Sequence, residues 1–163
     1  DIDKFKLFNG NLTVFKQVMF YFKLNLRVRN FDHDSGDGLW PGTRMLNFRL
    51  FKKINDVQKI RNFKAKKYGW WRLDKPRLNI INYGGWHFRF FGSSKNLKHE
   101  LENRSIGRGE NILSSYSESD INNIITNQLP FTTEEERYEV YPLSKMPDFV
   151  KLNKEKYTDS LIV

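Results

Sequence analysis

The order of two hydrophobic periodicities along the chain most constrains its fold. Extended, aromatic-rich segments come first, and segments with helical spacing follow them. Apolar residues recur at strand spacing through Phe15–Val28, and we predict further strands over Thr43–Phe51, Leu78–Tyr83 and Trp86–Phe91. Between the first two strands, Asn30–Gly42 contains Asp, Ser, Gly and Pro, which indicates a loop.

Helical spacing appears after these segments. A helix is predicted over Lys95–Asn103, because Leu97 and Leu101 lie four residues apart on one face and a serine precedes them as a cap. Ser117–Asn127 has the same combination of a serine cap and isoleucines at helical spacing, and Phe149–Tyr157 is predicted as a closing helix. Strands followed by helices predict an α/β fold, with a mixed sheet and flanking helices.

The chain length predicts one domain over residues 1–163, because 163 residues give room for one core. Apolar residues make up 39% and charged residues 29%, which is typical of a folded protein. No apolar run reaches the roughly 18 residues that span a bilayer. The sequence contains no cysteine and no secretory signal. These features favour the cytoplasm, although the chain begins at Asp1 and not at Met.

Positive charge is concentrated in the first part of the chain. Residues 1–110 contain 23 Lys and Arg against 10 Asp and Glu, whereas residues 111–163 contain 5 against 9. A basic body favours anionic partners, such as nucleotide diphosphates, nucleic acid or an acidic membrane, and a solvated Lys-rich surface is the alternative. The segment Arg44–Arg77 has 12 Lys and Arg together with Trp70 and Trp71, as a nucleic-acid-binding module requires.

The segment Tyr83–Gly92 contains the densest group of chemically useful residues. Its paired glycines, Gly84 and Gly85, allow the backbone to lie close to a ligand. The side chains that follow offer a stacking face, a metal ligand or proton carrier, and a diphosphate clamp; they are Trp86, His87 and Arg89. The residues alone leave a purely structural alternative open, in which the glycines form a bulge and Trp86 belongs to the core.

The run Gly-Gly-Trp-His-Phe-Arg-Phe-Phe-Gly within this segment resembles the Gly-Gly-Trp-His-Phe-Ser-Tyr-Phe-Gly signature of glycosyltransferase family 17. That family includes a β-1,4-mannosyl-glycoprotein β-1,4-N-acetylglucosaminyltransferase. The resemblance extends over roughly residues 13–155. Supporting motifs occur in the family's order: Phe20–Asn25, Leu39–Thr43, Gln58–Asn62, Ser93–Leu101, Tyr141–Leu143 and Phe149–Lys151.

The resemblance implies the C-terminal portion of a GT-A-like domain. The implied reaction is inverting transfer of N-acetylglucosamine or a related sugar from a UDP-sugar donor to a glycan acceptor, with Mn²⁺ or Mg²⁺ as cofactor. Members of the family have an Asp-x-Asp-Glu-Ile-Pro element before the aromatic strand. Here Asp1 and Asp3 have its spacing, but Lys4 and Phe5 follow them. We therefore expect the nucleotide-binding N-terminal half to be missing and the isolated chain to be catalytically silent or weak.

The resemblance also implies roles for individual residues. The expected metal ligands are His87, Asp1 and Asp3. The expected catalytic carboxylates are Glu110 and Asp34, although the histidine that relatives carry before the first of these is absent here. The expected substrate-binding residues are Gly84, Gly85, Trp86, Arg89, Trp40, Trp70 and Trp71.

Structural alternatives stay open for several of these residues. His87 can be a satisfied core histidine, the tryptophans can be core, and Asp34 lies in a segment that also reads as a solvated loop. Strand alternation predicts His87 and Arg89 on a cleft side and Trp86 with Phe88 in the core. A non-catalytic carbohydrate-binding protein and a basic nucleic-acid-binding module remain the rival functions.

Overall fold

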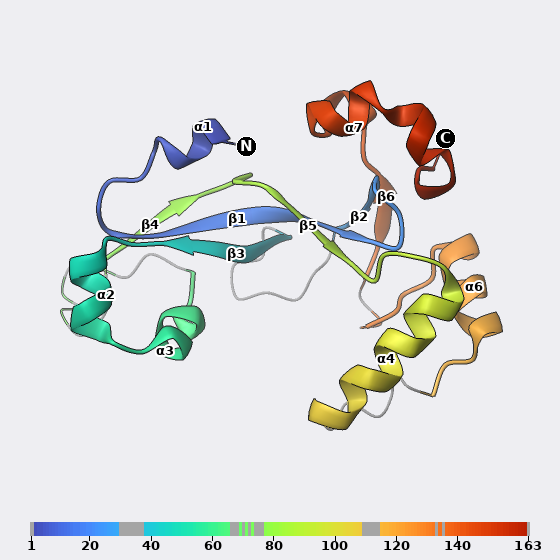
Figure 1. The fold of residues 1–163 in the computed structure, drawn as a ribbon, viewed down its shortest axis with the longest axis horizontal. Coiled ribbons are helices and arrows are strands. Elements are labelled where there is room, and N and C mark those ends of the chain that lie inside the picture. The colour runs from blue at the N-terminus through green and yellow to red at the C-terminus, as the bar shows by residue number, and fades with distance from the viewer. Residues whose placement is uncertain are drawn as a thin grey trace. The chain divides into compact units, whose positions relative to one another are not determined.

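A computed structural model describes residues 2–29, 38–65, 69, 71, 73, 77–108, 115–132, 134 and 136–162. Its elements are α1 (Ile2–Phe5), β1 (Leu12–Tyr21), β2 (Leu26–Val28), β3 (Leu39–Met45), α2 (Phe48–Ile54), α3 (Val57–Asn62), β4 (Leu78–Ile81), β5 (Trp86–Arg89), α4 (Ser94–Arg108), α6 (Glu118–Asn127), β6 (Tyr138–Val140), η1 (Leu143–Lys145), α7 (Asp148–Leu152) and η2 (Lys154–Ser160) (Figure 1).

The predicted mixed α/β class is confirmed. Six strands form one largely antiparallel sheet in which β3, β1, β2 and β6 are neighbours in that order, and β4 and β5 also pair with β1. The chain divides into two compact units, the first containing residues 1–18 and 32–87 and the second residues 19–31 and 88–163. The prediction of a single domain over 1–163 stays a prediction. Within the described residues, no helix combines the length and the apolar composition needed to span a bilayer.

The sheet of the first unit is built around β1. This strand pairs antiparallel with β3, with Gln17 opposite Trp40, and parallel with β4, with Phe15 opposite Ile81. Nearly every side chain of β1 is buried, so the strand lies in the core on both faces. The Phe5 ring of α1 packs edge-on against Phe15, with ring centroids 4.9 Å apart. Burial on both faces explains why apolar residues predominate in β1, where Thr13, Lys16 and Gln17 are the polar exceptions.

The predicted strand Phe15–Val28 is wrong in its second half, because the chain reverses direction after Tyr21. Phe22 has a left-handed backbone with φ of 63°, and β2 returns antiparallel with Arg27 opposite Phe20. The Asn25 side chain then donates to and accepts from the backbone of Ile162, each at 2.8 Å. The apolar alternation continues through this reversal, and for that reason it does not reveal the turn.

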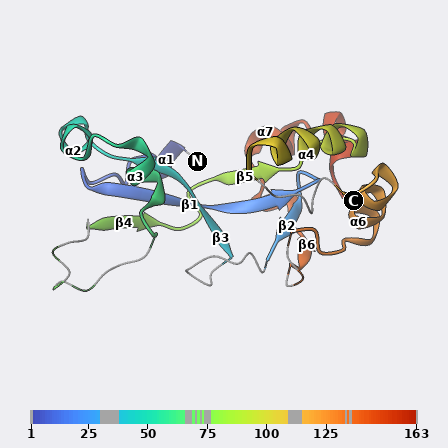
Figure 2. The same ribbon diagram turned by 90° about the horizontal axis from the view of Figure 1, so that it is seen from below.

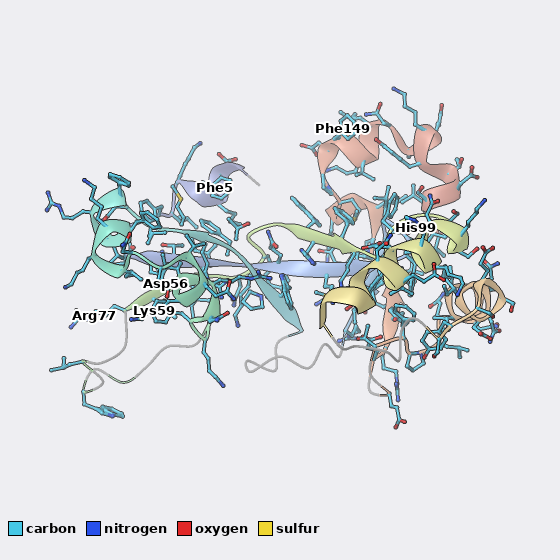
Figure 3. The ribbon with its side chains drawn as sticks, turned by 60° about the horizontal axis from the view of Figure 1, so that its bottom comes forward. Phe5, Asp56, Lys59, Arg77, His99 and Phe149 are labelled. Carbon is cyan, nitrogen blue, oxygen red and sulfur yellow. The ribbon has the colours of Figure 1, made fainter. Side chains whose placement is uncertain are left out.

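The predicted strand Thr43–Phe51 is also wrong after Met45. The Asn47 side chain accepts a hydrogen bond from the Leu50 N–H at 2.7 Å and caps α2. The helix ends where Asn55 takes up a left-handed conformation, and Asp56 then caps α3 by accepting from the Lys59 N–H at 2.9 Å. Figure 3 labels Asp56 and Lys59 on this helix. A capping asparagine therefore overrides the aromatic, strand-like composition of the segment.

The two helices predicted for the second unit are confirmed. Ser93 accepts from the Asn96 N–H at 3.3 Å at the start of α4, and Leu97 and Leu101 are buried as expected. A reciprocal capping box begins α6, which buries two isoleucines and packs against α4 (Figure 1 and Figure 2). The closing helix predicted over Phe149–Tyr157 is instead divided into α7 and the 3₁₀ helix η2.

An aromatic cluster forms the core of the second unit. Phe22, Phe90 and Phe131 pack together with ring centroids 5.0–6.3 Å apart, and Tyr21 meets the Phe90 ring edge-on at 5.0 Å. Beside these rings lies a buried carboxylate, Glu136, whose side chain is only 1% exposed. This unit therefore combines an aromatic core with a buried carboxylate.

Four groups donate hydrogen bonds to the buried Glu136 carboxylate. They are the backbone N–H groups of Phe131 and Thr132, each at 3.0 Å, the Thr132 hydroxyl, and the Tyr138 hydroxyl at 2.9 Å. Burial and the neighbouring negative charge of Glu136 raise the pKa of Tyr138. Burial also raises the pKa of Tyr21 to about 12, opposed by the positive charge of Arg89 and reinforced by Glu136. Glu136 thus organises the turn before β6, and its negative charge adds to the effect of burial on the pKa of both phenols.

The raised pKa of Tyr21 predicts a loss of stability in alkali. Between pH 10 and about 12 the unfolded chain loses this phenol proton while the folded chain keeps it, so the free energy of unfolding falls as the pH rises. By pH 11 we expect wild type to have lost about 1 kcal/mol relative to Tyr21→Phe. Urea denaturation of both proteins at pH 8, 10 and 11 measures the difference. Parallel stability curves would contradict the prediction.

Candidate functional site

Two of the predicted site residues meet in the first unit. The indole of Trp40, on β3, stacks on the imidazole of His87, on β5, with ring centroids 5.4 Å apart and planes inclined by 24°. Both strands pair with β1, and both side chains are half-buried, so part of the pair faces solvent. The stack is a flat, partly accessible surface with one titratable ring.

Backbone hydrogen bonds fix the chain just before this stack. The Gly84 N–H donates to the Lys16 carbonyl at 2.7 Å, and the Gly85 carbonyl accepts from the Val18 N–H at 3.0 Å. These bonds tie the glycine pair to β1 on the N-terminal side of His87. These hydrogen bonds use backbone groups of Gly84 and Gly85 that were expected to lie close to a ligand. In this structure the glycine pair therefore has a packing role. Their predicted role in substrate binding stays a prediction.

The glycine pair also permits close packing against β1. A Cβ atom added at Gly84 would lie 2.7 Å from the Phe15 Cβ and 3.2 Å from the Phe15 Cα. One added at Gly85 would lie 3.3 Å from the Gln17 amide nitrogen. The sheet therefore has no room for a side chain at Gly84.

Replacement of Gly84 by alanine is expected to destabilise the fold by about 1–3 kcal/mol, because the added methyl group overlaps Phe15 and the β1 backbone cannot retreat. Chemical denaturation measures this loss. Asn82→Ala, in the exposed turn before the glycines, is the control and should change stability by less than about 0.5 kcal/mol. An alanine variant as stable as the wild type would show that the strands can separate at this point.

Gln17 is a site residue that was not predicted from the sequence. It lies opposite Trp40 in β1, and its amide nitrogen donates to the Thr43 hydroxyl at 3.2 Å. Gly42 and Gly85 both adjoin its side chain, and a Cβ at Gly42 would overlap the Gln17 amide. A half-buried glutamine in a strand of buried residues is the signal that could have identified it. Its amide adds a hydrogen-bond donor and acceptor beside the ring stack.

Among the other signature residues, Trp86 is half-buried. The prediction that Phe88 packs into the core is wrong, because its side chain is 39% exposed, although one face stacks on Phe20 at 5.3 Å. Phe88 and Arg89 belong to the second unit. The Arg89 guanidinium lies 4.4 Å from the centroid of the Phe90 ring, and its backbone carbonyl accepts from the Phe22 N–H. The described contacts of Arg89 are thus with aromatic side chains.

The expected metal ligands are only partly described. Asp3 forms an exposed ion pair with Lys6 at 2.6 Å. Within the described ranges, no group of three or more His, Asp or Glu side chains converges as a metal site would require. Asp1, Asp34, Glu110 and Trp70 lie outside the described residues, whereas Trp71 is described and is 67% exposed. His87 and Asp3 by themselves do not make a donor set for Mn²⁺ or Mg²⁺.

No protein-family model, curated protein or solved structure matches the chain. The relation to glycosyltransferase family 17 accordingly remains a resemblance based on the quoted motifs.

Proposed function

We propose that the chain is part of a glycosyltransferase that binds a nucleotide sugar against the Trp40–His87 stack. One observation carries this proposal. Two motifs of the family-17 resemblance, the Trp-Pro-Gly-Thr run and the Gly-Gly-Trp-His run, lie far apart in the sequence, yet their Trp40 and His87 rings stack on each other. The pairing of β3 and β5 with β1 brings the two motifs to one place, as a shared binding site requires.

The chemistry of the neighbouring side chains suits this ligand. The indole of Trp40 offers a flat face for a sugar or base ring, and the Gln17 amide beside it can donate to and accept from hydroxyl groups. The His87 imidazole adds ring nitrogens that can donate or accept a hydrogen bond. In the transfer itself, an acceptor hydroxyl attacks the anomeric carbon, the bond to the diphosphate breaks, and the hydroxyl proton passes to a base.

Mapping of the nucleotide-sugar site by NMR tests this proposal. On titration with UDP-N-acetylglucosamine, the largest saturable shifts are expected at the Trp40 indole N–H, the His87 ring and the Gln17 amide group. Shifts confined to other parts of the chain, or no saturable shifts, would count against the site.

A second candidate function is the binding of nucleic acid, and the surface of α2 and α3 favours it. Five exposed basic side chains lie on these two helices: Arg49, Lys52, Lys53, Lys59 and Arg61. Asp56 is the one acid between Asn47 and Asn62, and it caps α3. An oligonucleotide that binds with a steep salt dependence, and that loses affinity in Lys52→Ala/Lys53→Ala, would support this function.

A further inference from the structure

The second unit contains a hollow of about 540 Å³. One of its lining residues, Gly92, is the last residue of the segment Tyr83–Gly92. Its walls include Gly92, the serines that begin α4, one face of α6 and the backbone that follows η2. This volume lies within the roughly 300–1,000 Å³ of small-molecule sites, so a disaccharide-sized ligand has room. All the lining residues belong to one compact unit.

The side chains that line the hollow are mainly neutral and polar. Ser94, Asn122, Thr126 and Gln128 all face it, and none of them has a side-chain hydrogen bond to another described residue. Asn122 and Thr126 lie four residues apart, so they share one face of α6. The hollow therefore presents several hydroxyl and amide groups that form no side-chain hydrogen bonds within the described part of the chain.

The described lining of the hollow carries little charge. Its single charged lining residue is Lys23, whose ammonium group donates to the Asp159 carbonyl at 2.5 Å. Aliphatic groups of Ile125 and Leu161 complete the wall. Neutral donors and acceptors beside aliphatic carbon match a sugar ring, which has hydroxyl edges and apolar C–H faces.

We propose that this hollow binds a neutral sugar unit of the glycan acceptor, with Asn122, Thr126 and Gln128 contacting its hydroxyl groups. The assignment to an acceptor rests on the proposed transferase function. The binding of a neutral sugar rests on the hollow alone.

The experiment measures binding of two neutral disaccharides, N,N′-diacetylchitobiose and mannobiose, to the 163-residue chain by NMR. At least one should bind saturably, with shifts at Ser94, Asn122, Thr126 and Gln128. The double variant Asn122→Ala/Thr126→Ala should weaken that binding at least tenfold. Asn123→Ala is the matched control, because Asn123 lies on the same helix but accepts from Asn127 at 2.6 Å and does not line the hollow. This control should bind like wild type.

Saturable binding of neither disaccharide, or equal binding by the double variant, would overturn the proposal. Displacement of the disaccharide by UDP alone would also overturn it, because the hollow would then be an anion site. UDP-N-acetylglucosamine binding, measured separately, distinguishes this outcome from failure of the transferase function. If the chain binds the disaccharide in the hollow but binds no nucleotide sugar, the sugar site stands. Its assignment to the glycan acceptor is then wrong.

Discussion

Replacement of Glu136 by alanine is expected to lower the free energy of unfolding by about 3–5 kcal/mol. The carboxylate is 1% exposed and accepts hydrogen bonds from two backbone N–H groups and from the hydroxyls of Thr132 and Tyr138. Without it, these donors stay buried with no partner, and each unsatisfied group costs about 1–3 kcal/mol. Some of this cost is recovered where water enters the vacated space.

Urea denaturation at pH 7 measures this effect. Glu134→Ala is the matched control, because that glutamate lies two residues away and is exposed, and its replacement should change stability by less than about 0.5 kcal/mol. Glu136→Gln keeps one acceptor oxygen and should fall between the two. A Glu136→Ala protein within 1 kcal/mol of wild type would show that the turn does not depend on this carboxylate.

The helices of the second unit could be predicted because their signals are local. In α6, the capping serine and the isoleucines at helical spacing lie within one short segment, so tertiary contacts are not needed to define it. The same holds for α4, where Ser93 precedes Leu97 and Leu101. The local sequence was misleading where one residue overrides the preference of its neighbours. The residues around Asn47 have the composition of a strand, but the Asn47 side chain caps α2.

The reversal after Tyr21 could not be predicted from alternation, because its signals are non-local. Phe22 adopts a left-handed backbone that is rare for an aromatic residue, and its ring is held by Phe90 and Phe131 from far along the chain. Asn25 is held by the backbone of Ile162. Likewise, nothing in the sequence shows that Glu136 is buried while Glu134 is exposed.

Individual residues of the candidate site could be predicted from the sequence, but their arrangement in space could not. The motifs identified Trp40 and His87 separately, and their stacking depends on the pairing of β3 and β5 with β1. Gln17 could not be predicted, because its hydrogen bond to Thr43 depends on the pairing of its strand with β3. The glycine pair was predicted to approach a ligand, whereas its clearest described contacts are with β1.

The Trp40–His87 stack predicts a large effect on nucleotide-sugar binding. Trp40→Leu keeps an apolar side chain in β3 but removes the aromatic face. We expect it to weaken UDP-N-acetylglucosamine binding about tenfold, since an aromatic contact contributes about 0.5–1.5 kcal/mol beyond buried area and 1.4 kcal/mol is a factor of ten. Trp40→Tyr keeps a ring and should retain most of the affinity. Phe149→Leu, at an exposed aromatic residue that is not part of the stack, is the control.

Isothermal titration of UDP-N-acetylglucosamine into these four proteins, each first shown to unfold cooperatively, tests the proposed transferase function most directly. The predicted result is saturable binding by wild type, by Phe149→Leu and by Trp40→Tyr, with about tenfold weaker binding by Trp40→Leu. Equal affinity of wild type and Trp40→Leu, or the absence of binding by folded wild type, would contradict the function proposed for this chain.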